Sequence, residues 1–221
     1  MSDTDSFIDE VTEEVRRDRL FALMRRYGWI AVVVVLLIVG GTAWNEWRKL
    51  QARETAQSFG DALMAGLGSG ESDARAAALS SVEAPNPGAA AIRDLLAAAE
   101  SMSVTPQEAA SRLLALADSD GADPVYRQIA ILKAVAMPGA GLSPEERRAR
   151  LEGLSLGDGL ARLLAQEQLA LIDVETGDTE AAIEGLQAIV VDAQATPGLR
   201  RRASQVIVAL GGELPGSGQG E

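Results

Sequence analysis

Residues 28–44 read Gly-Trp-Ile-Ala-Val-Val-Val-Val-Leu-Leu-Ile-Val-Gly-Gly-Thr-Ala-Trp, and no charged side chain lies between Arg26 and Glu46. The 19 uncharged residues span about 28 Å as an α-helix, at a rise of about 1.5 Å per residue. A bilayer's hydrocarbon core is about 30 Å thick. The run therefore predicts one transmembrane helix, which we place at residues 27–47.

Aromatic residues at both ends of the run support the same interpretation. Tyrosine and tryptophan rings prefer the headgroup level of a bilayer. The four aromatic residues expected at the two membrane interfaces are Tyr27, Trp29, Trp44 and Trp47.

Basic residues on either side of the run predict its orientation. Those before it are Arg16, Arg17, Arg19, Arg25 and Arg26, and those soon after it are Arg48, Lys49 and Arg53. Cytoplasmic flanks carry the excess of Lys and Arg. We therefore expect residues 1–26 to form a cytoplasmic amphipathic leader and the chain beyond Trp47 to lie across the membrane, in the periplasm of a bacterium.

Two other interpretations of the apolar run stay open. A signal peptide would use Gly41-Thr42-Ala43 as its cleavage site and end after Ala43. The leader, however, carries seven acidic side chains, and the apolar core is longer than that of a typical signal. A buried core helix of a soluble protein is the other alternative, and the flanking tryptophans and four consecutive valines argue against it.

Composition excludes several function classes. The 221-residue chain has no Cys and no His, so disulfides, thiolate nucleophiles, imidazole-based triads and the usual zinc or haem sites are excluded. Residues 54–221 hold 24 acidic and 12 basic side chains, and no basic stripe suited to phosphate is present. We expect no cofactor, no metal, no catalytic residue, no small-molecule substrate and no nucleic acid partner.

Beyond the membrane the pattern is helical. An N-cap residue stands directly before a proline at Thr105-Pro106, Asp123-Pro124, Ser143-Pro144 and Thr196-Pro197, which marks helix starts. Helices are predicted at residues 43–66, 72–82, 88–102, 106–118, 124–136, 144–153, 159–175, 179–194 and 197–210, with Gly139, Gly153, Gly177 and Gly211 as stops. Short loops make neighbours antiparallel, so residues 48–210 predict an all-α domain of stacked helix pairs. The glycine-rich tail 211–221 is expected to be disordered.

One helix hairpin carries a recognisable pattern. Residues 170–182 read Ala-Leu-Ile-Asp-Val-Glu-Thr-Gly-Asp-Thr-Glu-Ala-Ala and resemble the turn and second helix of a tetratricopeptide repeat. Ala170 and Ala182 stand at the small packing positions, Gly177 at the turn and Leu186 at the large position. The resemblance implies a tetratricopeptide-like α-solenoid after the membrane helix, although residues 88–137 match the repeat poorly.

Nearly the whole chain resembles the ancillary Sec translocon subunit family. The resemblance rests on the acidic leader, the single span ending in Trp44-Asn-Glu-Trp47, and a repeat domain ending in Ala195-Thr-Pro-Gly-Leu-Arg-Arg-Arg-Ala203. It implies a non-enzymatic, chaperone-like adaptor of the bacterial inner membrane whose partners are translocon subunits, periplasmic chaperones or emerging polypeptides. An envelope or cell-division assembly adaptor, independent of secretion, is the alternative. An enzyme would have to use Asp, Glu, Arg or Tyr alone, and it is disfavoured.

Several shorter motifs have a structural interpretation beside a functional one. Gly66–Ser72 resembles a phosphate loop faintly, but it has no Gly-Lys-Ser ending, so a helix connection is favoured. Asp118, Asp120 and Asp123 fit helix capping better than calcium binding. Two arginine clusters are either solvated arginines paired with local carboxylates or docking points for an acidic partner: Arg147, Arg148 and Arg150, and Arg200, Arg201 and Arg202.

Overall fold

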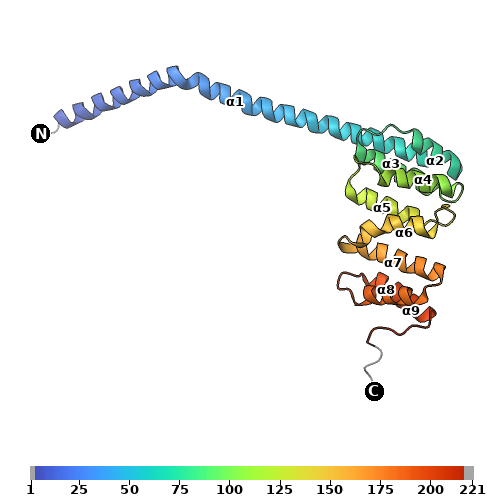
Figure 1. The fold of residues 1–221 in the computed structure, drawn as a ribbon. Coiled ribbons are helices and arrows are strands. Elements are labelled where there is room, and N and C mark those ends of the chain that lie inside the picture. The colour runs from blue at the N-terminus through green and yellow to red at the C-terminus, as the bar shows by residue number, and fades with distance from the viewer. Residues whose placement is uncertain (1–2, 217–221) are drawn as a thin grey trace. The chain divides into compact units, whose positions relative to one another are not determined.

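The computed structural model describes residues 3–216, with side chains placed at 24–30 and 32–216. Within that range every regular element is an α-helix, so the predicted all-α fold is confirmed. The helices, drawn in Figure 1, are α1 Asp3–Leu67, α2 Ser72–Ser81, α3 Pro87–Ser101, α4 Pro106–Ala117, α5 Pro124–Val135, α6 Pro144–Ser155, α7 Gly159–Thr176, α8 Thr179–Val191 and α9 Pro197–Ala209.

The helix starts follow the capping chemistry of the sequence, with one exception. Asp123 accepts a hydrogen bond from the Val125 N–H at 3.0 Å. Ser143 and Glu146 form a complete capping box at the start of α6. Thr105, predicted as a cap, makes no side-chain cap bond. Its backbone N–H donates to the Ser101 carbonyl instead, at 2.8 Å, which ties the start of α4 to the end of α3.

Two predicted helix ends are wrong. Helix α6 runs through Gly153 to Ser155. Gly153 lacks the positive φ that is typical of a glycine at a helix end, which Gly177 has at +89°. Helix α8 ends at Val191 rather than at residue 194. The Asp192 carboxylate accepts a hydrogen bond from the Gln194 N–H at 2.7 Å, a local bond that competes with the helix.

Residues 1–57 form one compact unit, of which the described part belongs to α1. Within the described residues, α1 is the one helix apolar and long enough to cross a membrane, with a mean hydropathy of 2.0 over its best window. None of that window is buried, which argues against a core helix of a soluble protein. The Trp44 and Trp47 rings lie 5.1 Å apart, and the Arg26 guanidinium lies 5.8 Å from the Tyr27 ring centre.

Residues 58–221 form the second unit, and we call its described part, 58–216, the helical domain. Helices α2 to α9 stack in chain order as antiparallel neighbours (Figure 1). Alternate helices also meet, since α5 packs against both α3 and α7. The domain is therefore a solenoid of helix pairs, as the sequence predicted.

The core of the helical domain consists of several hydrophobic clusters along the stack of helices rather than one central cluster. Alanines dominate the cluster of α3, α4 and α5, where Ala91, Ala98, Ala110 and Ala130 are buried. Small side chains let helices approach closely, while larger ones such as Leu163 and Ile207 fill the cluster of α7, α8 and α9. Helices α3 to α8 therefore bury apolar side chains against neighbours on two sides.

The segment after α9 packs onto the end of the stack. A Cβ atom at Gly212 would lie 3.0 Å from side-chain carbons of Ile183 and Ile207. The Gln187 side-chain amide donates to the Glu213 carbonyl at 2.7 Å. Residues 212 and 213, expected to belong to a disordered tail, are thus in contact with α8 and α9. Residues 217–221 of that expected tail lie outside the described residues.

Candidate functional site

The residues of the repeat-like hairpin lie where α7 and α8 meet. Ala170, Ala182 and Leu186 are buried, and Gly177 forms the left-handed turn between the two helices. A Cβ atom at Gly185 would lie 3.5 Å from the Ala170 Cβ, so the helices are in close contact at this point. These four predicted positions thus belong to the packing of the hairpin, which forms one wall of the candidate site.

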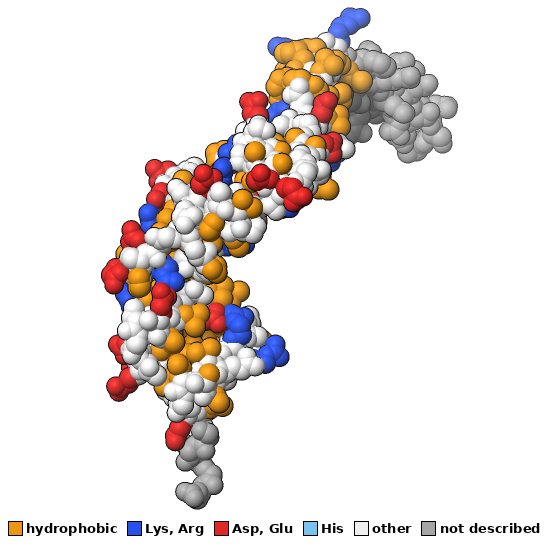
Figure 2. Space-filling view, turned by 90° about the vertical axis from the view of Figure 1, so that its right-hand side faces the viewer, with side chains coloured by type: hydrophobic (Ala, Val, Ile, Leu, Met, Phe, Trp, Pro, Cys, Tyr) orange, Lys and Arg blue, Asp and Glu red, His pale blue; other side chains and the backbone are white. Residues whose placement is uncertain are grey.

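The candidate site is an apolar groove of about 550 Å³ on one side of the helical domain. Helices α5, α7 and α9 supply most of its lining, and α8 contributes one side chain. Figure 2 shows hydrophobic side chains gathered in the lower half of the view with charged side chains beside them. The groove is lined by Ile129, Leu132, Lys133, Ala136, Leu164, Glu167, Gln168, Leu171, Leu186, Arg202 and Val206.

The apolar lining of the groove is partly open to solvent. Leu171 of α7 is 37% exposed and Ile129 of α5 is 36% exposed, although both are large aliphatic side chains. Apolar area left in contact with water in a concave site favours binding of another apolar surface.

An ion pair between α7 and α9 forms part of the groove wall. Arg202 donates from Nε and Nη2 to the two carboxylate oxygens of Glu167, at 2.9 and 2.8 Å. Glu167 is buried, at 7% exposure, whereas the Arg202 side chain is 55% exposed. The hydrogen bonds to Glu167 raise the pKa of Arg202 above its usual value. The pair neutralises a carboxylate that would otherwise be buried alone.

Lys133 is the other charged side chain in the groove lining. It is exposed, and no carboxylate in the described part of the chain pairs with it. Its place in the last turn of α5 suits a cation, because the carbonyl end of a helix is negative.

The three arginines considered as a possible docking point, Arg200, Arg201 and Arg202, make separate contacts. Arg200 donates to the carbonyls of Asp192 and Ala193 at the end of α8, at 3.0 and 3.3 Å. Arg202 belongs to the groove. Arg201 is exposed and lies beside a smaller cleft with Val208. Helix α9 thus distributes the three guanidinium groups over different surfaces.

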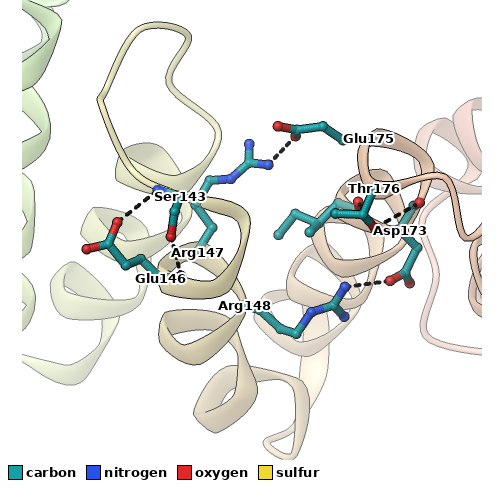
Figure 3. Close-up of polar contacts among 8 residues, drawn as sticks. Ser143, Glu146, Arg147, Arg148, Asp173, Glu175 and Thr176 are labelled. Atoms are coloured by element: carbon teal, nitrogen blue, oxygen red, sulfur yellow. Dashed lines mark hydrogen bonds and ion pairs between the residues drawn. The ribbon is translucent and has the colours of Figure 1, made fainter.

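The arginines of α6 are paired with carboxylates of neighbouring helices, as Figure 3 shows for Arg147 with Glu175 and for Arg148 with Asp173. The Arg148–Asp173 distance is 2.6 Å. Arg150 reaches Asp118, at 2.5 Å. The local pairing that the sequence offered as one interpretation therefore describes this cluster.

No group of residues in the described chain is arranged to hold a metal ion. Asp118 pairs with Arg150, and Asp123 caps α5. The glycine-rich segment between Gly66 and Ser72 connects the end of α1 to the start of α2. The side chains of Arg16, Arg17 and Arg19 lie outside the described residues.

The sequence analysis did not identify the residues that line this groove. The lining residues share a repeated spacing: Ile129, Leu132 and Lys133 on α5 with Ala136 directly after it, and Leu164, Glu167, Gln168 and Leu171 on α7. Both sets follow i, i+3, i+4 and i+7, which is one face of a helix. Each face holds aliphatic side chains and one charged residue.

These features define a class: a helical-repeat protein whose solenoid follows a single apolar helix of membrane-spanning length. A family model described as a tetratricopeptide repeat-like domain matches residues 25–138, and the chain belongs to this family. The match runs from the apolar part of α1 to the end of α5 and includes the segments whose repeat pattern is weak. Neither the curated proteins nor the solved structures include a match to this chain.

Proposed function

We propose that this chain is a membrane-anchored, chaperone-like adaptor that works with the Sec translocon through protein contacts. In this proposal residues 1–26 are cytoplasmic, residues 27–47 cross the bacterial inner membrane uncleaved, and residues 48–210 form the periplasmic domain. Its partners are translocon subunits, periplasmic chaperones or emerging polypeptides.

The groove over α5, α7 and α9 is the observation that carries the proposal. It is concave and mostly apolar, and part of its lining is in contact with solvent. Repeat solenoids commonly bind partners on such surfaces. The tetratricopeptide repeat-like family is in general a protein-interaction fold, which favours a scaffold over an enzyme.

The sequence supports the part of the proposal that places the protein at the translocon. The apolar part of α1 provides the anchor, and the excess of arginine before it favours a cytoplasmic N-terminus. The resemblance to the ancillary translocon family covers nearly the whole chain. An anchor raises the local concentration of the domain at the membrane, so weak contacts are sufficient for function.

Photo-crosslinking in intact membranes tests the proposal. A benzoylphenylalanine probe replaces Leu171 in the groove, and a matched probe replaces Leu156, which is 87% exposed and absent from the groove lining. We expect translocon subunits or periplasmic folding factors to be captured from position 171 and not from 156. Envelope or division proteins at position 171 would favour the alternative adaptor. Equal capture from both positions would refute a role for the groove.

A further inference from the structure

Arg202 is held in place while most of its hydrogen-bond donors stay unused. A guanidinium has five N–H groups. Two of them, on Nε and Nη2, bond to Glu167, and no other partner of Arg202 is found among the described residues. Three N–H groups on an exposed guanidinium therefore stay available at the groove.

These unused donors restrict what can occupy the groove. An apolar segment lying over the groove would remove water from the Arg202 guanidinium. A donor that loses water and gains no acceptor is strongly unfavourable. A suitable occupant must therefore bring an acceptor to this place, and a carboxylate forms the strongest hydrogen bonds with a guanidinium.

Lys133 adds a second cation to the same lining. Glu167 is already neutralised by Arg202, so the groove carries one net positive charge. The domain around it is acidic, with 24 acidic and 12 basic side chains over residues 54–221. The negative electrostatic field of the domain repels polyacidic chains, and salt at physiological ionic strength screens this field beyond about 8 Å. The local charge thus favours a single carboxylate inside an otherwise apolar segment.

We propose that the groove binds an apolar protein segment that carries one Asp or Glu side chain, whose carboxylate is received by Arg202 and Lys133. This inference rests on the proposed function and specifies its partner. A lysine at the same place in the segment meets Lys133 and the unused donors of Arg202, so like charge disfavours its binding.

Three fluorescent 15-residue peptides of Leu, Ala and Ser, with Glu, Gln or Lys at the centre, test this with the full chain in nanodiscs. Fluorescence anisotropy measures binding, and empty nanodiscs give the blank. We expect the Glu peptide to bind about fivefold more tightly than the Gln peptide, the range of a partly exposed ion pair. The Lys peptide is expected to bind most weakly.

The variants separate the two cations from general packing. The triple variant K133Q/E167Q/R202Q removes both cations and leaves no orphan carboxylate, and it is expected to bind the Glu and Gln peptides equally. The matched control R201Q changes the neighbouring exposed arginine and should keep the preference. Equal binding of Glu and Gln peptides to the unaltered chain overturns the inference, as does a preference that survives in the triple variant. Absence of binding by all three peptides also overturns the inference. The proposed function is tested separately, by the crosslinks from position 171.

Discussion

Arg202 of α9 binds both carboxylate oxygens of Glu167 of α7, two helices earlier in the solenoid. The pair fastens alternate helices together at the wall of the groove. Glu167 is buried and the Arg202 side chain is about half exposed, so the two side chains contribute unequally to the stability of the domain.

Removal of the arginine is expected to destabilise the domain more than removal of both charges. R202M leaves Glu167 as an unpaired carboxylate, at a cost of about 2 kcal/mol for a lost bond to a charged group. The double variant E167Q/R202M has no buried charge and should regain at least half of that loss. Urea unfolding followed by circular dichroism measures both. Equal stability of the two variants would contradict the role of Glu167 as a buried charge.

The Asp192–Arg162 pair predicts a dependence of stability on pH. The hydrogen bond from Arg162, at 2.8 Å, lowers the pKa of Asp192 below its usual 3.8. A lowered folded-state pKa stabilises the domain above the unfolded pKa, and the contribution is lost as pH falls through the folded value. D192N should therefore lower the melting temperature at pH 7 and have no effect well below pH 3.8. D120N, at an exposed and unpaired carboxylate, serves as the control.

Two glycines should respond oppositely to alanine. Gly177 has a φ of +89°, where a Cβ atom is strained, so G177A should cost about 1 kcal/mol. Gly153 lies inside α6, and a Cβ atom there meets nothing within 4 Å. G153A should stabilise the domain by about 0.5–1 kcal/mol through helix propensity. Destabilisation by G153A would mean that α6 ends at that glycine after all.

The contact of Gly212 with the last helices is also testable. G212A places a Cβ atom 3.0 Å from Ile183 and Ile207 and should cost about 1–3 kcal/mol through overpacking. G198A is the control, because a Cβ atom at Gly198 meets nothing within 4 Å. Thermal melts of the two variants give the comparison. Similar melting temperatures of G212A and G198A would show that the chain after α9 adjusts to the added methyl group without loss of stability.

The absence of cysteine makes the proposed orientation easy to measure. S6C and S111C each introduce a single thiol, on opposite sides of the span. A membrane-impermeant maleimide added to cells with a permeabilised outer membrane should label S111C, whereas S6C should need lysis. Labelling of S6C before lysis would reverse the orientation that the arginine excess predicts.

Local signals explain why so much of the fold was predictable. A proline preceded by Asp123, Ser143 or Thr196 sets both the backbone and the cap of a helix start within two or three residues. Such a capping signal needs no contact with residues that lie far away in the sequence. The helix ends were predicted less well, since Gly153 carries no information about its own φ and Asp192 ends α8 through a local bond.

The groove was not predictable in the same way, because α7 is apolar around most of its circumference. Leu163 faces the cluster with α9, and Ile172 faces the cluster with α5 and α6. Leu171 lines the groove, and Leu164 both lines the groove and packs against the cluster with α9. The spacing of hydrophobic residues alone cannot tell which of them face a core cluster and which line the groove, since it does not show which helices pack against α7. Glu167 is the sequence clue, as a carboxylate between apolar stripes requires a cation from another helix.

The segment that carries Gly212 and Glu213 also covers part of one end of the solenoid. A solenoid has two open ends, and an apolar end surface that fits the first helix of another copy propagates as an open fibre rather than a closed dimer. Residues 212 and 213 lie over the junction of Ile183, Gln187 and Ile207, where a further repeat would stack. These two residues thus cover part of the end surface of the solenoid, which leaves less of that surface for another copy to stack on.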